Sequence, residues 1–124
     1  QCLLVEDGSA HAVHLEVVVG GGGDDDALPL GVLSLFLPST AGGRAQFRKL
    51  AVAPAWRKQG LATALIQVAA AEARIAGAMA LYCHARHEQL AFYTRRGFVV
   101  AGEPFAKYGD DGPLYVEMTM DLPP

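Results

Sequence analysis

The chain has 124 residues, 52% of them apolar, and a formal net charge of −3 at pH 7. This length predicts one domain spanning residues 1–124, and the apolar content excludes global disorder. The acidic balance disfavours a nucleic-acid partner, which needs a basic face. No apolar run approaches the length of a membrane span and no signal peptide is visible, so we expect a cytoplasmic protein without a membrane partner.

The cysteine and aspartate positions argue against a metal site. Cys2 and Cys83 form neither a disulfide framework nor a metal pattern. Cys83 lies inside an apolar stretch, so we expect a small buried hydrophobe there. The aspartates at 24–26 follow four glycines but lack the spacing of a calcium loop. We predict a solvated turn over residues 20–26 and no bound metal.

The first half of the chain has the pattern of successive strands. Residues 1–7 are apolar and then acidic, and we interpret them as the end of an earlier element. Strands are predicted at 11–19, 31–37 and 46–52, because apolar and β-branched residues gather there between turns that contain Gly or Pro. The short connections imply antiparallel pairing of these strands.

The second half alternates helices with strands. A helix is predicted at 58–76, where apolar residues recur on one helical face. The later elements are a strand at 80–84, a short helix at 88–96, a strand at 98–100, a long turn at 103–113 and a last strand at 114–121. Because a helix separates the strand at 46–52 from the strand at 80–84, these two strands should be parallel.

The turn before the first helix has the features of an anion site. Pro54 ends the preceding strand, and no Ser, Thr, Asp or Asn at 56–62 caps the first N–H groups of the helix. These N–H groups and the helix dipole attract an anion. Gly60 lets the backbone approach a ligand closely, while Arg57 and Lys58 add positive charge. The segment indicates a phosphate site, although an ordinary strand-to-helix loop with solvated basic residues fits the same residues.

Two motifs resemble those of one family. The pattern Arg-x-x-Gly-x-Ala at 57–62 is similar to the coenzyme-A-binding signature of the GNAT-type N-acetyltransferase superfamily, which is (Arg/Gln)-x-x-Gly-x-(Gly/Ala). The pattern Phe-Tyr-x-x-x-Gly-Phe at 92–98 resembles the end of the family's next helix. The resemblance covers residues 11–120. Within the superfamily it looks closest to the ElaA-like branch, through His-Ala-Arg at 84–86 and Tyr-Gly-Asp-Asp-Gly at 108–112.

The resemblance implies the fold class. We expect an α/β fold with a mixed, mostly antiparallel sheet, in which a central parallel strand pair is splayed apart and helices flank the sheet (the GNAT-like acyl-CoA transferase fold). The family usually opens with a strand and one or two helices that shape the acceptor side. Almost nothing precedes residue 11, and the chain starts at Gln1 rather than at a methionine. We therefore expect these amino-terminal elements to be largely missing, which leaves the acceptor pocket undefined.

The resemblance also implies acetyl-CoA as a co-substrate. Backbone amides at 59–63 should wrap its pyrophosphate, and the strand before the turn should offer unpaired amides to its pantetheine arm, as an added strand would use them. A backbone N–H near Leu50 could face the thioester carbonyl. The expected cofactor-binding residues are Leu50, Ala51, Val52, Arg57, Lys58, Gln59, Gly60, Leu61, Ala62 and Thr63.

Two side chains are candidate catalytic residues. Tyr93 stands where many relatives place a tyrosine near the cofactor sulfur, and a phenol can protonate a departing thiolate. The alternative is an aromatic side chain packed between helix and sheet. His84 titrates in the range that a general base requires, with a backbone-bonded histidine or a water chain as alternatives. Some relatives carry a glutamate where Gln46 stands, and an amide cannot take a proton. Arg95 and Arg96 are expected to face solvent.

Together these expectations predict an acetyl-CoA-dependent N-acetyltransferase in which the primary amine of a small molecule or peptide attacks directly. Cys83 has no identifiable base partner, so no acyl-enzyme is expected. The alternative is a non-catalytic acyl-CoA-binding or regulatory module, which the missing glutamate favours. A nucleotide-binding domain is disfavoured because the turn lacks the Lys-Ser/Thr ending of a P-loop. A homodimer is compatible with the sequence.

Overall fold

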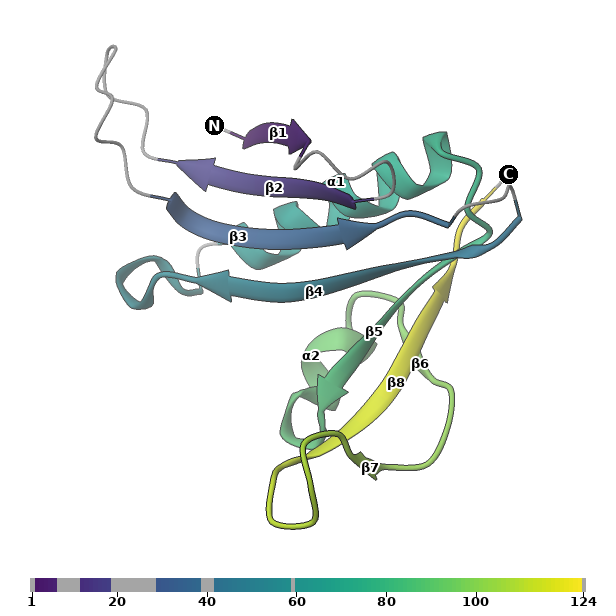
Figure 1. Ribbon diagram of the computed structural model, residues 1–124. Coiled ribbons are helices and arrows are strands. Elements are labelled where there is room, and N and C mark those ends of the chain that lie inside the picture. The colour runs from purple at the N-terminus through teal and green to yellow at the C-terminus, as the bar shows by residue number, and fades with distance from the viewer. Residues whose placement is uncertain (1, 7–11, 19–28, 39–41, 59, 124) are drawn as a thin grey trace.

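The structure, a computed structural model, describes residues 2–6, 12–18, 29–38, 42–58 and 60–123 (Figure 1). Its strands are β1 (Cys2–Glu6), β2 (Ala12–Val18), β3 (Pro29–Phe36), β4 (Arg44–Val52), β5 (Ala80–Arg86), β6 (Val99–Val100), β7 (Phe105–Ala106) and β8 (Leu114–Asp121). Its helices are α1 (Leu61–Ile75) and α2 (Leu90–Thr94), with 3₁₀ turns at Pro54–Trp56 and His87–Gln89. The strands form one sheet in the order β1-β2-β3-β4-β5-β8-β6, and β7 pairs with β8.

The strand pairing confirms the predicted fold class. Neighbours from β1 to β4 are antiparallel, and β5, β6 and β7 each run antiparallel to β8. β4 and β5 are the one parallel pair among the described strands. They are parallel because α1 lies in the connection between them and carries the chain back to the starting edge. The protein is therefore an α/β fold with a mixed sheet, a central parallel pair and flanking helices.

β4 and β5 touch only briefly before they separate. β4 continues to Val52 beside β3 alone, and β5 continues to Arg86 beside β8 alone. Figure 1 shows the two strands leaving a common point and spreading into a V, which we call the split. Gln46 and Tyr82 are the last paired residues and form its apex. The paired positions are Arg44↔Ala80, Ala45↔Leu81 and Gln46↔Tyr82.

A β-bulge in β4 lies inside the split. The register between β3 and β4 shifts between Val32 and Ser34. Leu33 therefore lies opposite two residues of β4, Lys49 and Leu50. Lys49 has a φ of 58°, a left-handed conformation that is uncommon for a residue with a side chain. A bulge bends the strand that carries the extra residue and increases its twist, which accounts for the divergence of β4 from β5.

The hydrophobic core lies between the sheet and both helices. α1 packs against β2, β3, β4 and β5, and α2 packs against β5. Both helices lie behind the sheet in Figure 1, and among the described residues no helix covers the opposite face, which we call the helix-free face. Gly31 allows α1 to approach β3 closely, because a Cβ there would lie 3.1 Å from Leu65 Cδ1. The largest fully buried side chains are Phe98, Leu33, Leu35, Leu65, Leu81, Met118 and Val116.

The strands β1 and β7 were not predicted from the sequence. Residues 1–7, interpreted as the end of an earlier element, contain β1, which pairs antiparallel with β2. Residues 7–11, which lie outside the described ones, connect β1 to β2 in the sequence. β7 lies within the predicted turn at 103–113, and a strand of two residues leaves no alternating pattern to detect. The predicted turn at 20–26 lies wholly outside the described residues.

The boundaries of the helices also differ from those predicted. α1 begins at Leu61 rather than near residue 58, because Lys58 and Gly60 have positive φ values of 63° and 80°. The helix predicted at 88–96 begins as a 3₁₀ turn and continues as the five residues of α2. The last strand has the predicted bounds, 114–121.

Candidate functional site

The start of α1 presents uncapped backbone N–H groups. Gly60 is the N-cap residue and adopts the left-handed conformation, with no side chain bonded to the helix start. The first intrahelical bond runs from Ala64 N–H to the Gly60 carbonyl at 2.9 Å. The N–H groups of Leu61, Ala62 and Thr63 therefore have no partner within the helix. With no acidic residue in the first turn, the helix dipole is left to attract an external anion.

A cavity of about 500 Å³ lies beside this helix start. It is bounded by the end of β4 on one side, by the turn and the first residues of α1 on another, and by α2 on the third. Its lining residues are Leu50, Ala51, Val52, Trp56, Arg57, Lys58, Gly60, Leu61, Ala62, Thr63, Gln89, Phe92, Tyr93 and Arg96. Nine of the ten predicted cofactor-binding residues are thus brought together around one space, and the tenth, Gln59, lies outside the described residues.

The end of β4 contributes a strand edge to the cavity. Leu50, Ala51 and Val52 lie beyond the three positions at which β4 pairs with β5. On their other side, Ala51 and Val52 pair with β3. A strand directs its N–H and C=O groups alternately to its two edges, so the edge that faces the split keeps polar groups without a strand partner. An extended ligand could bond this edge as an added strand would.

Basic side chains surround the helix start. Arg57 and Lys58 are exposed, and Arg57 Nε donates to the Val52 carbonyl at 3.3 Å. Arg96 links the two helices: its Nε donates to Thr63 Oγ1 at 2.8 Å and its Nη1 to the Phe92 carbonyl at 2.7 Å. Its guanidinium also lies 3.7 Å from the centroid of the Phe92 ring. The residues fit a phosphate-bearing ligand, because donors and positive charge converge at one end of the cavity.

Arg96 is one of four lining residues that the sequence analysis missed, and it was expected to face solvent. Trp56, Gln89 and Phe92 are the others. Phe92 and Arg96 are four residues apart at the end of α2, a spacing that places two side chains on one face. That spacing was the available signal for Arg96, whereas nothing in the sequence indicated that α2 would face α1.

Tyr93 lines the cavity and is otherwise enclosed by aromatic rings. Only 7% of its surface is exposed. Its ring lies 6.1 Å from that of Phe47, 5.8 Å from that of Phe98 and 4.9 Å from that of Phe92, measured between centroids. Burial raises the pKa of the Tyr93 phenol above its usual range, so the hydroxyl stays protonated at all ordinary pH values. The side chain therefore packs among the core aromatics and also contributes to the lining of the cavity.

His84 lies on the other side of the sheet. Its neighbours Cys83 and Ala85 point into the core, so the alternation of β5 places His84 on the helix-free face. Its Nε2 is 3.7 Å from Glu117 Oε1, and its Nδ1 is buried without a hydrogen-bond partner among the described residues. Burial first, then Lys107, lowers the pKa of His84 despite the opposing effect of Glu117. The imidazole is therefore neutral at pH 7 and able to accept a proton.

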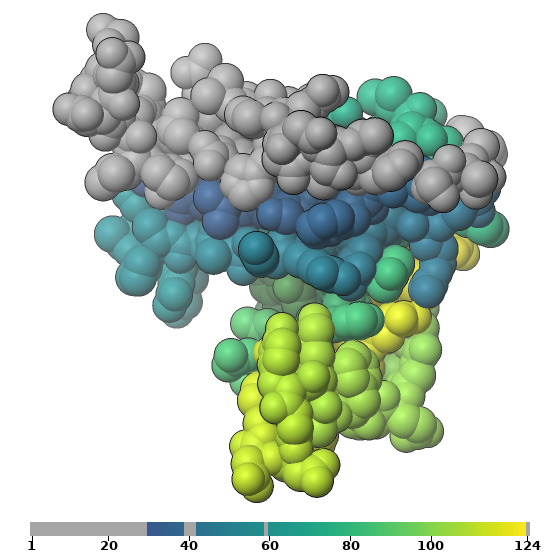
Figure 2. Space-filling model, viewed as in Figure 1, coloured from purple at the N-terminus to yellow at the C-terminus, as the bar shows by residue number. Residues whose placement is uncertain are grey.

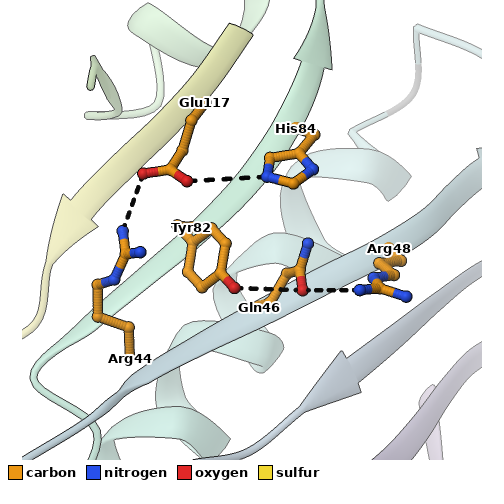
Figure 3. A network of polar contacts seen from close by, with 6 residues as sticks. All are labelled: Arg44, Gln46, Arg48, Tyr82, His84 and Glu117. Atoms are coloured by element: carbon orange, nitrogen blue, oxygen red, sulfur yellow. Dashed lines mark hydrogen bonds and ion pairs between the residues drawn. The ribbon is translucent and has the colours of Figure 1, made fainter. Parts of the chain in front are cut away.

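The two candidate catalytic residues thus stand on opposite faces of the sheet. Figure 3 shows the residues that surround His84, which come from β4, β5 and β8. Tyr82 hydroxyl donates to Gln46 Oε1 at 3.3 Å, and Arg48 Nη2 donates to the same oxygen at 3.2 Å. The amide oxygen of Gln46 is thus occupied by two donors. An amine could reach both candidates only through the split.

Cys83 matches its expected structural role. It is 3% exposed, and burial raises the pKa of its thiol to about 12. A thiol in this setting is not a nucleophile at neutral pH.

The family assignment agrees with this geometry. The model of the acetyltransferase (GNAT) domain matches residues 11–100. This match covers most of the chain, and the chain belongs to the GNAT acetyltransferase family. No curated protein matches the sequence at a significant level.

Solved structures of similar fold include ligand-bound enzymes. A GNAT family acetyltransferase from Elizabethkingia anophelis with acetyl-CoA bound has a TM-score of 0.72 at 15% identity, covering 98% of this chain and 97% of that one. An aminoglycoside 6'-N-acetyltransferase complexed with coenzyme A has a TM-score of 0.70 at 13% identity, covering 93% and 75%. Nourseothricin acetyltransferase has a TM-score of 0.74 at 23% identity, covering 92% and 67%. At these identities the likeness is one of fold.

The described residues contain neither a membrane-spanning helix nor a cluster of metal-ligating side chains. Neither helix in the described part of the chain has the length and apolar character that crossing a membrane requires. Within the same residues, no three His, Cys, Asp or Glu side chains gather as metal ligands would.

Proposed function

We propose that the protein, as one acetyltransferase domain over residues 1–124, moves an acetyl group from acetyl-CoA to a primary amine by direct attack. The observation that supports this most is the early separation of β4 from β5 beside an uncapped helix start. It combines an unpaired strand edge with anion-binding N–H groups around one cavity. Both features suit a ligand with a diphosphate at one end and an amide-containing arm at the other.

In this proposal the backbone holds the co-substrate. The N–H groups at 60–63 donate to the diphosphate, with Arg57 and Lys58 adding positive charge at the mouth of the cavity. The edge of β4 at Leu50–Val52 bonds the pantetheine arm, and the Leu50 N–H faces the thioester carbonyl. Bound acetyl-CoA supplies an activated acyl group, so no metal is required.

Two side chains handle the protons. In the balanced reaction a C–N bond forms and a C–S bond breaks, the amine nitrogen loses one proton and the sulfur gains one. Tyr93 donates its proton to the sulfur: the phenol is protonated at neutral pH, and the burial that raises its pKa also makes it a weaker acid. Neutral His84 accepts the proton of the amine from the helix-free face. The acceptor enters on that face and meets the thioester in the split.

Calorimetry with acetyl-CoA, followed by thiol release on a panel of primary amines, tests the proposal. Binding together with amine-dependent thiol release is the expected result. Absence of acetyl-CoA binding to the folded protein would overturn it.

One observation favours a second candidate, a non-catalytic acyl-CoA-binding or regulatory module. Gln46 cannot take a proton, and its oxygen is occupied by Tyr82 and Arg48. Tight binding of acetyl-CoA without thiol release on any amine would select this candidate instead.

A further inference from the structure

The charges around His84 are unbalanced. The charged groups close enough to shift its pKa are Lys107, Glu117 and Arg48. Arg44 joins them through Glu117, since its Nη1 lies 3.1 Å from Glu117 Oε2. Around this part of the helix-free face, three cations (Arg44, Arg48 and Lys107) thus meet one carboxylate, that of Glu117. Figure 3 shows Arg44, Arg48 and Glu117. The whole chain has a net charge of −3, so this local excess of positive charge runs against its overall balance. Such an excess attracts an anionic group to this part of the surface.

Two of the three cations have no acidic partner. Arg44 is satisfied by Glu117 and lies over the Tyr82 ring at 4.1 Å. Arg48 is exposed and bonds a neutral partner, the Gln46 side chain, through Nη2. Among the described residues it makes no ion pair, which leaves several guanidinium donors available.

Lys107 is the second unpaired cation. Its Nζ lies 5.6 Å from the Tyr108 ring centroid and 5.4 Å from the Tyr115 ring centroid. The described residues offer it no carboxylate. Two residues before Lys107, the Phe105 ring packs against His84, with its centroid 5.2 Å from the imidazole centroid. An aromatic wall and an ammonium group thus border His84 on the β7 side.

Figure 2 looks onto the helix-free face and shows that the β7–β8 segment stands apart from the end of β4, with open space between them. Arg48 belongs to the β4 side of this space and Lys107 to the β7 side. A ligand at His84 would therefore lie near two unpaired cations, both of which act on the imidazole.

This field has a consequence for any amine at His84. A cationic surrounding favours the neutral over the charged form of a basic group, so it lowers the pKa of a bound ammonium as it lowers that of the imidazole. The neutral amine is the nucleophile. The same field repels an acceptor with further positive charges and attracts one with a negative charge at the other end.

We propose that the acceptor is an amine that also carries a carboxylate, as an amino acid does, and that Arg48 binds the carboxylate. This inference rests on the proposed function, because it assigns the acceptor side of the same site. The planar guanidinium of arginine can bind a carboxylate through two parallel hydrogen bonds. The Cζ atom of Arg48 lies over the Phe36 ring, 5.1 Å from its centroid, and this contact helps to hold the guanidinium in place.

Matched acceptor pairs test this inference. L-phenylalanine is compared with phenylalaninamide and with phenethylamine, and spermidine serves as the polycation. Rates are read as thiol release at saturating acetyl-CoA. We expect kcat/KM for the carboxylate-bearing acceptor to exceed that of the two partners without a carboxylate by at least about tenfold and that of spermidine by more, with the preference shrinking as salt is raised.

Arg48→Gln should remove the preference by raising KM for phenylalanine at least about tenfold while changing KM for phenethylamine much less, since phenethylamine has no carboxylate for Arg48 to bind. Arg48→Lys, which keeps the charge but loses the fork, should retain part of it. Arg74→Gln, at an exposed position in the last turn of α1, is the matched control and should change nothing.

The outcomes separate this inference from the proposed function. A protein that binds acetyl-CoA and turns over spermidine or phenethylamine better than phenylalanine refutes the acceptor class but keeps the acetyltransferase. Retention of the preference in Arg48→Gln refutes the role of Arg48. Failure to bind acetyl-CoA, or to acetylate any amine, overturns both.

Discussion

The two faces of the split are built in different ways. On the helix side, the cavity lies beside the end of β4, which has no strand partner there, and beside the uncapped N–H groups at the start of α1. On the helix-free face, side chains form the surface, with a histidine, a carboxylate and three cations drawn from β4, β5, β8 and the segment after β7. The comparison teaches that the proposed co-substrate side would depend on chain geometry, whereas the proposed acceptor side would depend on residue identity.

The strongest test of the geometric side is Gly60→Glu. A side chain at φ 80° is strained, and a carboxylate at the helix start repels a diphosphate. We expect acetyl-CoA affinity to fall at least about 100-fold, or about 2.7 kcal/mol, by calorimetry. Gly60→Lys carries the same strain without the repulsion and should lose less. Gly102→Glu, at an exposed glycine with open space around it, is the control. If both Gly60 variants lost the same affinity for acetyl-CoA, backbone strain alone would explain the loss, and the proposed anion site at the start of α1 would be wrong.

The next effect concerns Tyr93, the proton donor proposed on the helix side. Tyr93→Phe keeps the ring packing but removes the hydroxyl proton, so kcat should drop about 10- to 100-fold while KM for acetyl-CoA changes little. Steady-state kinetics measures both. An unchanged kcat would make Tyr93 an aromatic of the core and nothing more.

His84 gives the acceptor face a pH dependence. Its pKa is lowered from the ordinary 6.5, so its charge changes only below that value. As pH falls through this window the unfolded chain takes up a proton more readily than the folded one, and stability declines. Activity should decline in the same window because the protonated imidazole cannot act as a base.

The matched variant for this dependence is His84→Asn, which cannot titrate. In this variant the kcat/KM profile should lack the fall at acidic pH. Its free energy of unfolding, measured by urea denaturation between pH 5 and 7, should also decrease less than that of the wild type as the pH is lowered. If the variant showed the same fall in kcat/KM at acidic pH as the wild type, a group other than His84 would be responsible for it.

The smallest predicted effect is that of the contact between the helices. Thr63→Val removes the hydroxyl that receives Arg96 Nε but keeps the backbone N–H groups of α1. We expect a rise of about two- to fivefold in KM for acetyl-CoA, equal to about 1 kcal/mol or less. Thr94→Val, which removes a similar hydroxyl bonded to the Leu90 carbonyl, should leave KM unchanged. A larger effect of Thr94→Val would show that helix stability, not Arg96, sets KM.

The difference between the two faces also decides what the sequence could predict. The turn at 57–62 and the strand before it were located because Pro54 and Gly60 constrain the backbone in ways that depend on residue type. Tyr93 was found through its motif. The bulge at Lys49 was not located, because the chain accepts a left-handed lysine there without any glycine signal.

The acceptor side was harder to foresee for a physical reason. Arg48, Glu117 and Lys107 are far apart in sequence and meet only because β4, β5 and β8 adjoin. Cation placement of this kind leaves no local pattern. Arg96 was expected in solvent for the same reason, since its partner Thr63 belongs to another helix. Sequence patterns recover local backbone geometry better than they recover contacts between distant segments.

Amide chemical shifts recorded on the ¹⁵N-labelled protein during titration with coenzyme A test the central claim most directly. The account predicts large shifts for the N–H groups at 60–63 and at Leu50–Val52, and small ones for Tyr82, His84 and Glu117. Shifts gathered on the helix-free face, with the start of α1 unmoved, would contradict it.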